Sequence, residues 1–239
     1  MTDKIRIGDQ WYVSVHAARA EEAPLVLKHD DTFAMFDRFG DMRVLATGEQ
    51  GLYHEDTRHL SHLELLMDGV RPMYLRSAVR EDNDIAAVDL MNPDLPRHGV
   101  PKGTVHLFRA KLLWEGACHE RLRLTNHGDR PARFTLSVQF DADFADLFEV
   151  RGLRREQRGE RLAPHVRPES VELPYRARDG RLLRTRVVFD PPPQQLTERQ
   201  ADFEIALAPK QELYLCCTVS CEHEAMQPRR AVAFTTAFR

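Results

Sequence analysis

The sequence predicts an all-β fold, a large antiparallel β-sandwich with few short helices. Three observations support this prediction. Apolar and polar residues alternate with a period of two in most segments. Short turns containing Gly, Asp or Asn separate these segments. No amphipathic pattern is longer than two or three helical turns. Because so many strands in one open sheet would expose its edges, we expect two sheets packed face to face.

The first half of the chain contains two predicted hairpins. Residues 32–37 and 42–46 flank the turn formed by residues 38–41, which contains one glycine. Residues 63–67 and 70–75 flank Asp68-Gly69. An Asp-Gly pair is a strong hairpin signal, because both central residues of a type I′ turn need positive φ. We therefore expect each pair of segments to form two neighbouring antiparallel strands.

The second half is more regular. Leu122 and Leu124 share one face of their segment, while Arg121 and Arg123 share the other, as in a half-buried antiparallel strand. Asp179-Gly180 predicts a further hairpin, and residues 208–211 predict a turn between the last two strands. The predicted strands of this half are residues 104–114, 118–125, 132–140, 172–178, 181–189, 202–207 and 212–219.

Composition indicates an ordinary soluble protein. The 239 residues include 34 basic and 37 acidic side chains, a net charge of −3, which gives no reason to expect nucleic acid as a partner. No segment approaches the roughly 20 apolar residues of a membrane helix, so no membrane partner is expected. The first residues lack the apolar core of a signal peptide, and we expect a cytoplasmic location.

Two local features have ordinary structural explanations. Residues 151–186 contain eleven Arg and five acidic residues, but the acidic run at 141–149 precedes them, so a solvated face of paired charges is favoured over a phosphate-binding patch. The cysteines match neither a zinc-binding pair nor a disulfide framework, and buried free thiols are expected. They are Cys118, Cys216, Cys217 and Cys221.

Catalytic and cofactor-binding patterns are absent from the sequence. No Gly-rich phosphate loop or G-x-S-x-G elbow is present, and no cofactor is expected. The acids of residues 141–149, together with Glu55 and Asp56, could supply the two carboxylates of a glycoside hydrolase. Capping of loop amides or pairing with Arg151 explains them better.

Some individual side chains have the chemistry for metal binding or for stacking against a sugar. No metal is expected, because the candidate cluster of His54, Asp56, His59 and His62 lacks a recognised ligand spacing. The acids of residues 141–146 likewise lack the central Gly of a calcium loop. Core packing is the more frequent role of any single aromatic side chain. The candidates for stacking against a sugar are Trp11, Tyr53, His54, Trp114, Phe144 and Phe148.

Two stretches resemble the N-terminal domain of bacterial glycogen debranching enzymes, the amylo-α-1,6-glucosidase-like glycoside hydrolases. The first is residues 33–75, centred on GLYHEDTRHLSHLELLMDGVRPMYL, and the second is FDADFADLFEVRG at residues 140–152. The resemblance implies a super-sandwich type of β-sandwich, followed in the full enzyme by an (α/α) barrel that carries the catalytic carboxylates. It also implies removal of α-1,6-linked glucose at glycogen branch points, or action on other glucosides.

On this basis we expect residues 1–221 to form the sandwich and residues 222–239 to begin a linker to a barrel domain of the same polypeptide. The domain would support that barrel and possess no catalytic residues of its own. Alternatives are a stand-alone carbohydrate-binding module and a mutarotase-like sugar epimerase, which needs a His facing a carboxylate in one cleft.

We expect residues 56–58 and 143–151 to lie at one end of the sandwich, where Asp56 or Asp146 would pair with Arg58 or Arg151. This end would face the barrel, and α-glucan is a further expected partner. The candidate residues for glycan binding or interdomain contact are Tyr53, His54, Asp56, Thr57, Arg58, Asp143, Asp146, Phe148 and Arg151.

Overall fold

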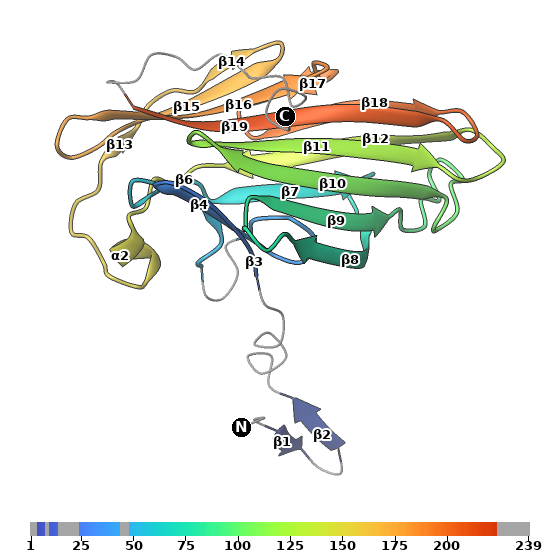
Figure 1. The fold of residues 1–239 in the computed structure, drawn as a ribbon, viewed down its shortest axis with the longest axis horizontal. Coiled ribbons are helices and arrows are strands. Elements are labelled where there is room, and N and C mark those ends of the chain that lie inside the picture. The colour runs from blue at the N-terminus through green and yellow to red at the C-terminus, as the bar shows by residue number, and fades with distance from the viewer. Residues whose placement is uncertain (1–3, 8–9, 14–23, 44–47, 224–239) are drawn as a thin grey trace.

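A computed structural model describes residues 4–7, 10–13, 24–43 and 48–223 (Figure 1). Strands contain 59% of the residues, and the sheets are antiparallel and packed as a sandwich, which confirms the predicted fold class. The described part contains one short helix, α2 (Leu147–Val150). No helix in these ranges has the length and apolar character needed to cross a membrane. The expected linker at residues 222–239 lies, apart from its first two residues, outside the described ranges.

The strands follow one another along almost the whole chain. They are β1 (Lys4–Ile7), β2 (Gln10–Val13), β3 (Leu25–His29), β4 (Thr32–Phe36), β5 (Gly51–His54), β6 (Thr57–Leu60), β7 (His62–Met67), β8 (Met73–Val79), β9 (Ile85–Met91), β10 (Val105–Trp114), β11 (Ala117–Asn126), β12 (Ala132–Asp141), β13 (Glu160–Arg161), β14 (His165–Arg167), β15 (Ser170–Arg176), β16 (Leu182–Asp190), β17 (Gln195–Leu196), β18 (Gln200–Leu207) and β19 (Glu212–His223).

One layer of the sandwich is a nine-stranded sheet. Its order is β13-β15-β16-β19-β11-β10-β9-β8, with β14 added beside β15. The last described strand, β19, therefore lies inside the sheet, hydrogen-bonded to β11 on one side and to β16 on the other. Two four-stranded sheets face it, β17-β18-β12-β7 and β3-β4-β5-β6, while β1 and β2 form a separate pair.

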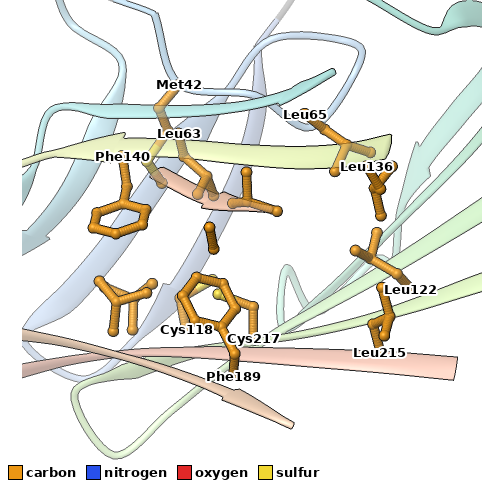
Figure 2. Packing of buried hydrophobic residues seen from close by; sticks show 14 of the residues in the cluster. Met42, Leu63, Leu65, Cys118, Leu122, Leu136, Phe140, Phe189, Leu215 and Cys217 are labelled. Carbon is orange, nitrogen blue, oxygen red and sulfur yellow. The ribbon is translucent and has the colours of Figure 1, made fainter. Parts of the chain in front are cut away.

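The core lies between these layers. Along β7 and β12, every second side chain is buried, including Leu63, Leu65, Leu136 and Phe140. Figure 2 shows these side chains pointing toward others that come from β11, β16 and β19. Burying one such Leu or Phe side chain contributes about 1.5–3 kcal/mol. The opposite side chains of the same strands remain on the outer face. The partners seen in Figure 2 are Cys118, Leu122, Phe189, Leu215 and Cys217.

The strands were predicted more accurately than their partners. The hairpin at Asp179-Gly180 is confirmed as β15 and β16. Asp68 and Gly69 have the expected positive φ values of 47° and 77°, yet β8 pairs with β9 in the large sheet and does not return along β7. The last two strands are also not partners, because β18 pairs with β12 and β19 with β11. In both cases the chain crosses from a four-stranded sheet to the nine-stranded sheet.

The predicted hairpin of residues 32–37 and 42–46 is also wrong. Residues 32–36 form β4 as expected, but β4 pairs with β3 and β5. Met42 forms an isolated bridge with Leu63, and residues 44–46 lie outside the described ranges. The loop between them instead buries Asp41, whose side chain is fully inaccessible.

Asp41 belongs to a buried charge network that the sequence did not predict. Arg109 donates to Asp41 Oδ1 at 2.5 Å and to Glu120 Oε1 at 2.6 Å. Lys111 Nζ lies 2.7 Å from Glu120 Oε2, and Arg71 donates to Asp41 Oδ2 at 2.8 Å. Arg109, Lys111 and Glu120 are at most 4% exposed. A network of this kind is costly to break, because removing one member leaves an uncompensated buried charge.

The cysteines and the Arg-rich region match most of what was predicted for them. All four thiols are free, and Cys118, Cys217 and Cys221 are buried as expected, whereas Cys216 is only half-buried. Cys216 and Cys217 lie on opposite faces of β19, as their adjacency requires. The Arg-rich region forms ion pairs with acidic residues, for example Arg167 with Glu172 at 3.2 Å. It is therefore a face of paired charges.

Candidate functional site

Within the first resemblance segment, β5 and β6 form a tight hairpin. Its two turn residues, Glu55 and Asp56, have φ values of 45° and 62°. A two-residue turn with both φ values positive matches the twist of the flanking strands and normally selects Asn or Gly. Neither residue here is glycine, so the turn holds local strain, which in proteins is often found at functional sites. This hairpin was not predicted, because the segment lacks the usual turn residues.

The second segment lies along the first. The N–H of Arg58 donates to Ala145 O at 2.9 Å, and the N–H of Leu147 donates to Asp56 O at 3.1 Å. Thr57 and Asp146 form an antiparallel bridge between these two hydrogen bonds. The prediction that residues 56–58 and 143–151 lie together is therefore confirmed. We call the two segments with their shared contacts the signature junction.

A partly buried ion pair connects the two segments of the signature junction. Arg58 donates through Nε to Asp143 Oδ1 at 3.1 Å and through Nη2 to Asp143 Oδ2 at 2.5 Å. Its remaining nitrogen, Nη1, donates to the carbonyl oxygens of Gly48 and Gln50. Burial opposes the charge of Arg58, but the bonds to Asp143 outweigh it and raise the pKa of the guanidinium. The geometry is bidentate, the strongest form of this interaction.

The predicted partners of Arg58 were different, and the structure corrects them. Asp146 does not pair with Arg58. Its Oδ2 accepts from Arg155 at 2.6 Å, and its Oδ1 accepts from the N–H groups of Phe148 and Glu149 at 2.9 Å, capping α2. Partial burial by itself would raise the pKa of Asp146. The amide of Glu149 and the guanidinium of Arg155 outweigh this effect and keep the pKa below its ordinary value. Asp56 is exposed and contributes its backbone oxygen, and Arg151 is also exposed.

The carboxylates of residues 141–149 are distributed among separate cations. Besides the two pairs above, Asp141 lies 3.4 Å from Arg161, and Glu149 lies 2.9 Å from Arg158. A general acid for glycoside hydrolysis needs a raised pKa, whereas that of Asp146 is lowered. This arrangement suits a structural clamp better than an acid and base pair.

The aromatic candidates separate into core and surface groups. Tyr53 is 1% exposed, stacks on Phe33 with ring centroids 4.5 Å apart, and donates its hydroxyl to Glu49 O at 2.7 Å. Phe144 is 4% exposed and stacks on another ring. Neither presents a face to a sugar. Phe148 on α2 is 64% exposed and Trp114 is 43% exposed, so these two retain stacking surface, while the side chain of Trp11 lies outside the described part.

A polar groove lies beside the signature junction and was missed in the sequence. It has a volume of about 650 Å³ on the outer face of the sheet β17-β18-β12-β7. Gln139 Nε2 donates to Gln200 Oε1 at 3.0 Å between the neighbouring strands β12 and β18, and His62 Nε2 lies 3.8 Å from Glu64 Oε2. The sequence does contain a signal for this groove, because its polar lining residues on β7 and β12 alternate with buried core residues. The lining residues are Arg43, Ser61, His62, Glu64, Gln139, Phe140, Asp141, Thr197, Arg199 and Gln200.

The histidines considered as metal ligands do not form one site. His62 lines the groove, whereas His59 is 2% exposed and its Nδ1 lies 3.2 Å from Arg184 O. Burial, and secondarily the nearby His54, lower the pKa of His59 to about 3, so it is a neutral buried imidazole. Asp56 is exposed at the turn. His54 does approach a different acidic residue, Glu55, and a different histidine, His223.

Comparisons with known proteins agree with this architecture. The family model described as the N-terminal domain of some glycogen debranching enzymes matches residues 27–218. No curated protein matches. The chain is similar to the solved structure entitled "Putative kojibiose phosphorylase from human microbiome", with a TM-score of 0.58 and 9% identity over 90% of this chain and 31% of that one. It therefore spans about a third of that protein's length.

A second similar structure is the Slr1438 protein from Synechocystis sp. PCC 6803. The TM-score is 0.51 at 9% identity, covering 84% of this chain and 96% of that one. At such identity the two structures show a shared fold alone. The family model covers most of the chain, including both segments of the signature junction. The chain belongs to the family of N-terminal domains of glycogen debranching enzymes.

Proposed function

We propose that this chain is a non-catalytic domain that supports the catalytic barrel of a glycogen-debranching-type glycoside hydrolase. The observation that carries the proposal is the partly buried, bidentate pair of Arg58 and Asp143, which holds together the two segments that carry the family resemblance. The acids nearby are used in pairs with arginines and in the cap of α2. These contacts give the signature junction a fixed geometry. The free thiols are consistent with the reducing cytoplasm as its location.

The exposed end of the junction supplies the contact with the barrel. Phe148 is 64% exposed although it lies on a helix whose position is fixed by the cap at Asp146. A large aromatic side chain on a rigid, exposed element is typical of an interface anchor. In the complete enzyme, Phe148 would pack on the barrel or line the glycan entrance beside it.

Two measurements test this function. The 239-residue chain alone should release no glucose from glycogen, limit dextrin or an aryl α-glucoside above the blank. In the parent polypeptide, Phe148→Ala should lower debranching activity at least about fivefold while the unfolding midpoint stays unchanged. The matched control is Val166→Ala, at another exposed apolar position on β14, which should retain activity. Hydrolysis by the isolated chain, or full activity of Phe148→Ala, would overturn the proposal.

The polar groove favours a second candidate function, binding of α-glucan. Amide, guanidinium and carboxylate groups line it, and these donors and acceptors suit sugar hydroxyls. Affinity electrophoresis in glycogen-containing gels tests this directly. Retardation of the chain should be lost in Gln139→Ala and kept in Gln157→Ala, whose exposed side chain lies outside this groove. Equal migration with and without glycogen would refute glycan binding.

The epimerase alternative has one feature in its favour in the same groove. His62 and Glu64 lie side by side on β7, with Nε2 and Oε2 3.8 Å apart, so the groove contains a histidine next to a carboxylate. Polarimetry of α-D-glucose mutarotation tests it. If the chain accelerates the approach to equilibrium and His62→Gln abolishes the effect, the groove is a sugar epimerase site.

A further inference from the structure

Three potential metal ligands converge at one end of the sandwich, and no sequence pattern links them. His54 ends β5, Glu55 begins the tight turn, and His223 ends β19 in the large sheet. One ligand atom from each lies within 4.8 Å of the other two, with Glu55 Oε1 and His223 Nε2 at 3.8 Å. The sequence-based expectation of no metal rested on a different group of residues, which the fold does not bring together.

The surroundings orient these side chains as they would be in a metal site. His54 Nδ1 lies 2.8 Å from Thr32 Oγ1, so the ring is held by a hydrogen bond on one nitrogen and Nε2 is the nitrogen that would bind the ion. Metal-binding imidazoles are normally oriented in this way.

The strained turn contributes the carboxylate. Glu55 adopts a φ of 45°, which is uncommon for a residue other than Gly, Asn or Asp. This conformation brings its side chain toward His223, a residue of the other layer. A role for Glu55 as a ligand would give the strain of the turn a reason, whereas Gly at this position would form the same turn without it.

We propose that His54, Glu55 and His223 bind one divalent cation of the zinc class. Imidazole nitrogen favours zinc and its neighbours over calcium or magnesium. Zinc lies about 2.0–2.2 Å from such ligands, which places tetrahedral ligand atoms roughly 3.4 Å apart. The observed separations therefore need only small inward rotations of exposed or half-buried side chains. Three protein ligands leave a fourth position for water or for an oxygen atom of a bound molecule.

An ion at this position would connect the two layers. The β5–β6 turn belongs to one four-stranded sheet, and His223 belongs to the nine-stranded sheet. The turn also contains Asp56, whose backbone oxygen accepts from the second segment of the signature junction. Bound metal would therefore stiffen the same end of the domain that we assign to contact with the barrel. Because the ligands belong to this chain alone, the metal proposal stands or fails independently of that function.

The test is zinc titration of the full 239-residue chain, prepared without a histidine tag and treated with a chelator. Calorimetry should give one saturable site per chain, and zinc should raise the unfolding midpoint by mass action. Cobalt(II) substitution should give visible d–d absorption with nitrogen and oxygen ligands. His54→Ala and His223→Ala should each weaken binding at least about 100-fold, more than the loss of an outer hydrogen-bond partner causes. Glu55→Gln should also weaken it.

The matched control is His165→Ala. Its imidazole is also 3.7 Å from a carboxylate, that of Glu172, but it is 66% exposed and has no second histidine in the group of ligands above. This variant should bind zinc as the wild type does. If His54→Ala does not fold, as judged by far-UV circular dichroism, Glu55→Gln and His223→Ala decide the result. No saturable binding, or binding that survives both of those changes, would refute the site.

Discussion

Replacing Glu120 by Gln should destabilise the domain in a manner that depends on pH. Glu120 is 4% exposed and accepts from Arg109 at 2.6 Å, with Lys111 at 2.7 Å. Burial alone would raise its pKa, but the two cations outweigh burial and lower it from 4.5 to about 2. Glutamine keeps the size of the side chain but removes its negative charge. The positive charge of Lys111, and part of that of Arg109, is then no longer balanced by a neighbouring carboxylate.

The magnitude follows from the pKa shift. A drop from 4.5 to about 2 corresponds to about 3 kcal/mol, since one pKa unit equals about 1.4 kcal/mol. Breaking a buried ion pair by removing one partner costs about 3–5 kcal/mol, which agrees. Because the folded-state pKa is depressed, this stabilisation is fully present above about pH 4.5 and is lost as the pH falls toward 2. The difference between wild type and variant should therefore shrink in acid.

Urea unfolding followed by far-UV circular dichroism, at pH 7 and at several lower values, measures this difference. At pH 7, Glu120→Gln should lower the free energy of unfolding by about 3 kcal/mol. Adding Lys111→Met should restore part of it, because the unpaired buried cation is removed. Glu160→Gln, with a side chain 70% exposed, is the control and should stay within about 0.5 kcal/mol of wild type. A Glu120→Gln variant as stable as this control, or a loss independent of pH, would refute the reasoning.

Two further predictions concern the backbone and the thiols. Gly51→Ala should lower the free energy of unfolding by about 2 kcal/mol, because a Cβ there would lie 2.5 Å from Arg58 Cδ and 2.8 Å from Leu60 O. Urea unfolding measures this change, and an unchanged free energy of unfolding would contradict the close approach. In the native chain at pH 8, a thiol reagent should modify half-buried Cys216 before Cys217. Burial raises the pKa of both thiols, but it raises that of Cys217 much further. Mass spectrometry of labelled peptides gives the order, and earlier labelling of Cys217 would disprove it.

The sequence predicted local structure well and pairing poorly, for a physical reason. Alternation shows which face of a strand is buried, as at Leu122 and Leu124, and the turn residues show where the chain reverses. Neither signal states whether the next strand stays in the same layer. Asp68-Gly69 forms the expected turn, yet the chain then enters the other sheet, where β8 pairs with β9 while β7 pairs with β12.

The candidate site was likewise predicted in its broad arrangement but not in its individual side-chain partners. The proximity of the two resemblance segments was predicted, and so was an ion pair between them, but the acidic partner of Arg58 was not. Asp143 and Asp146 are only three residues apart, and the capping of α2 by Asp146 decides which carboxylate remains for Arg58. His223 was not considered as a ligand at all. It is distant in sequence from His54 and comes near it because β19 ends close to the β5–β6 turn.

The position of β19 also determines when the domain can finish folding during synthesis. Residues 117–126 and 182–190 become sheet neighbours only through residues 212–223, which fill the space between them. Until that strand leaves the ribosome, both partners present open edges, and such edges invite pairing with other chains. A nascent chain stalled near residue 210 should therefore depend on chaperones, whereas one extended past residue 223 by the length of the exit tunnel should become resistant to protease. The catalytic barrel proposed above would, in the complete enzyme, begin to emerge only after this closure.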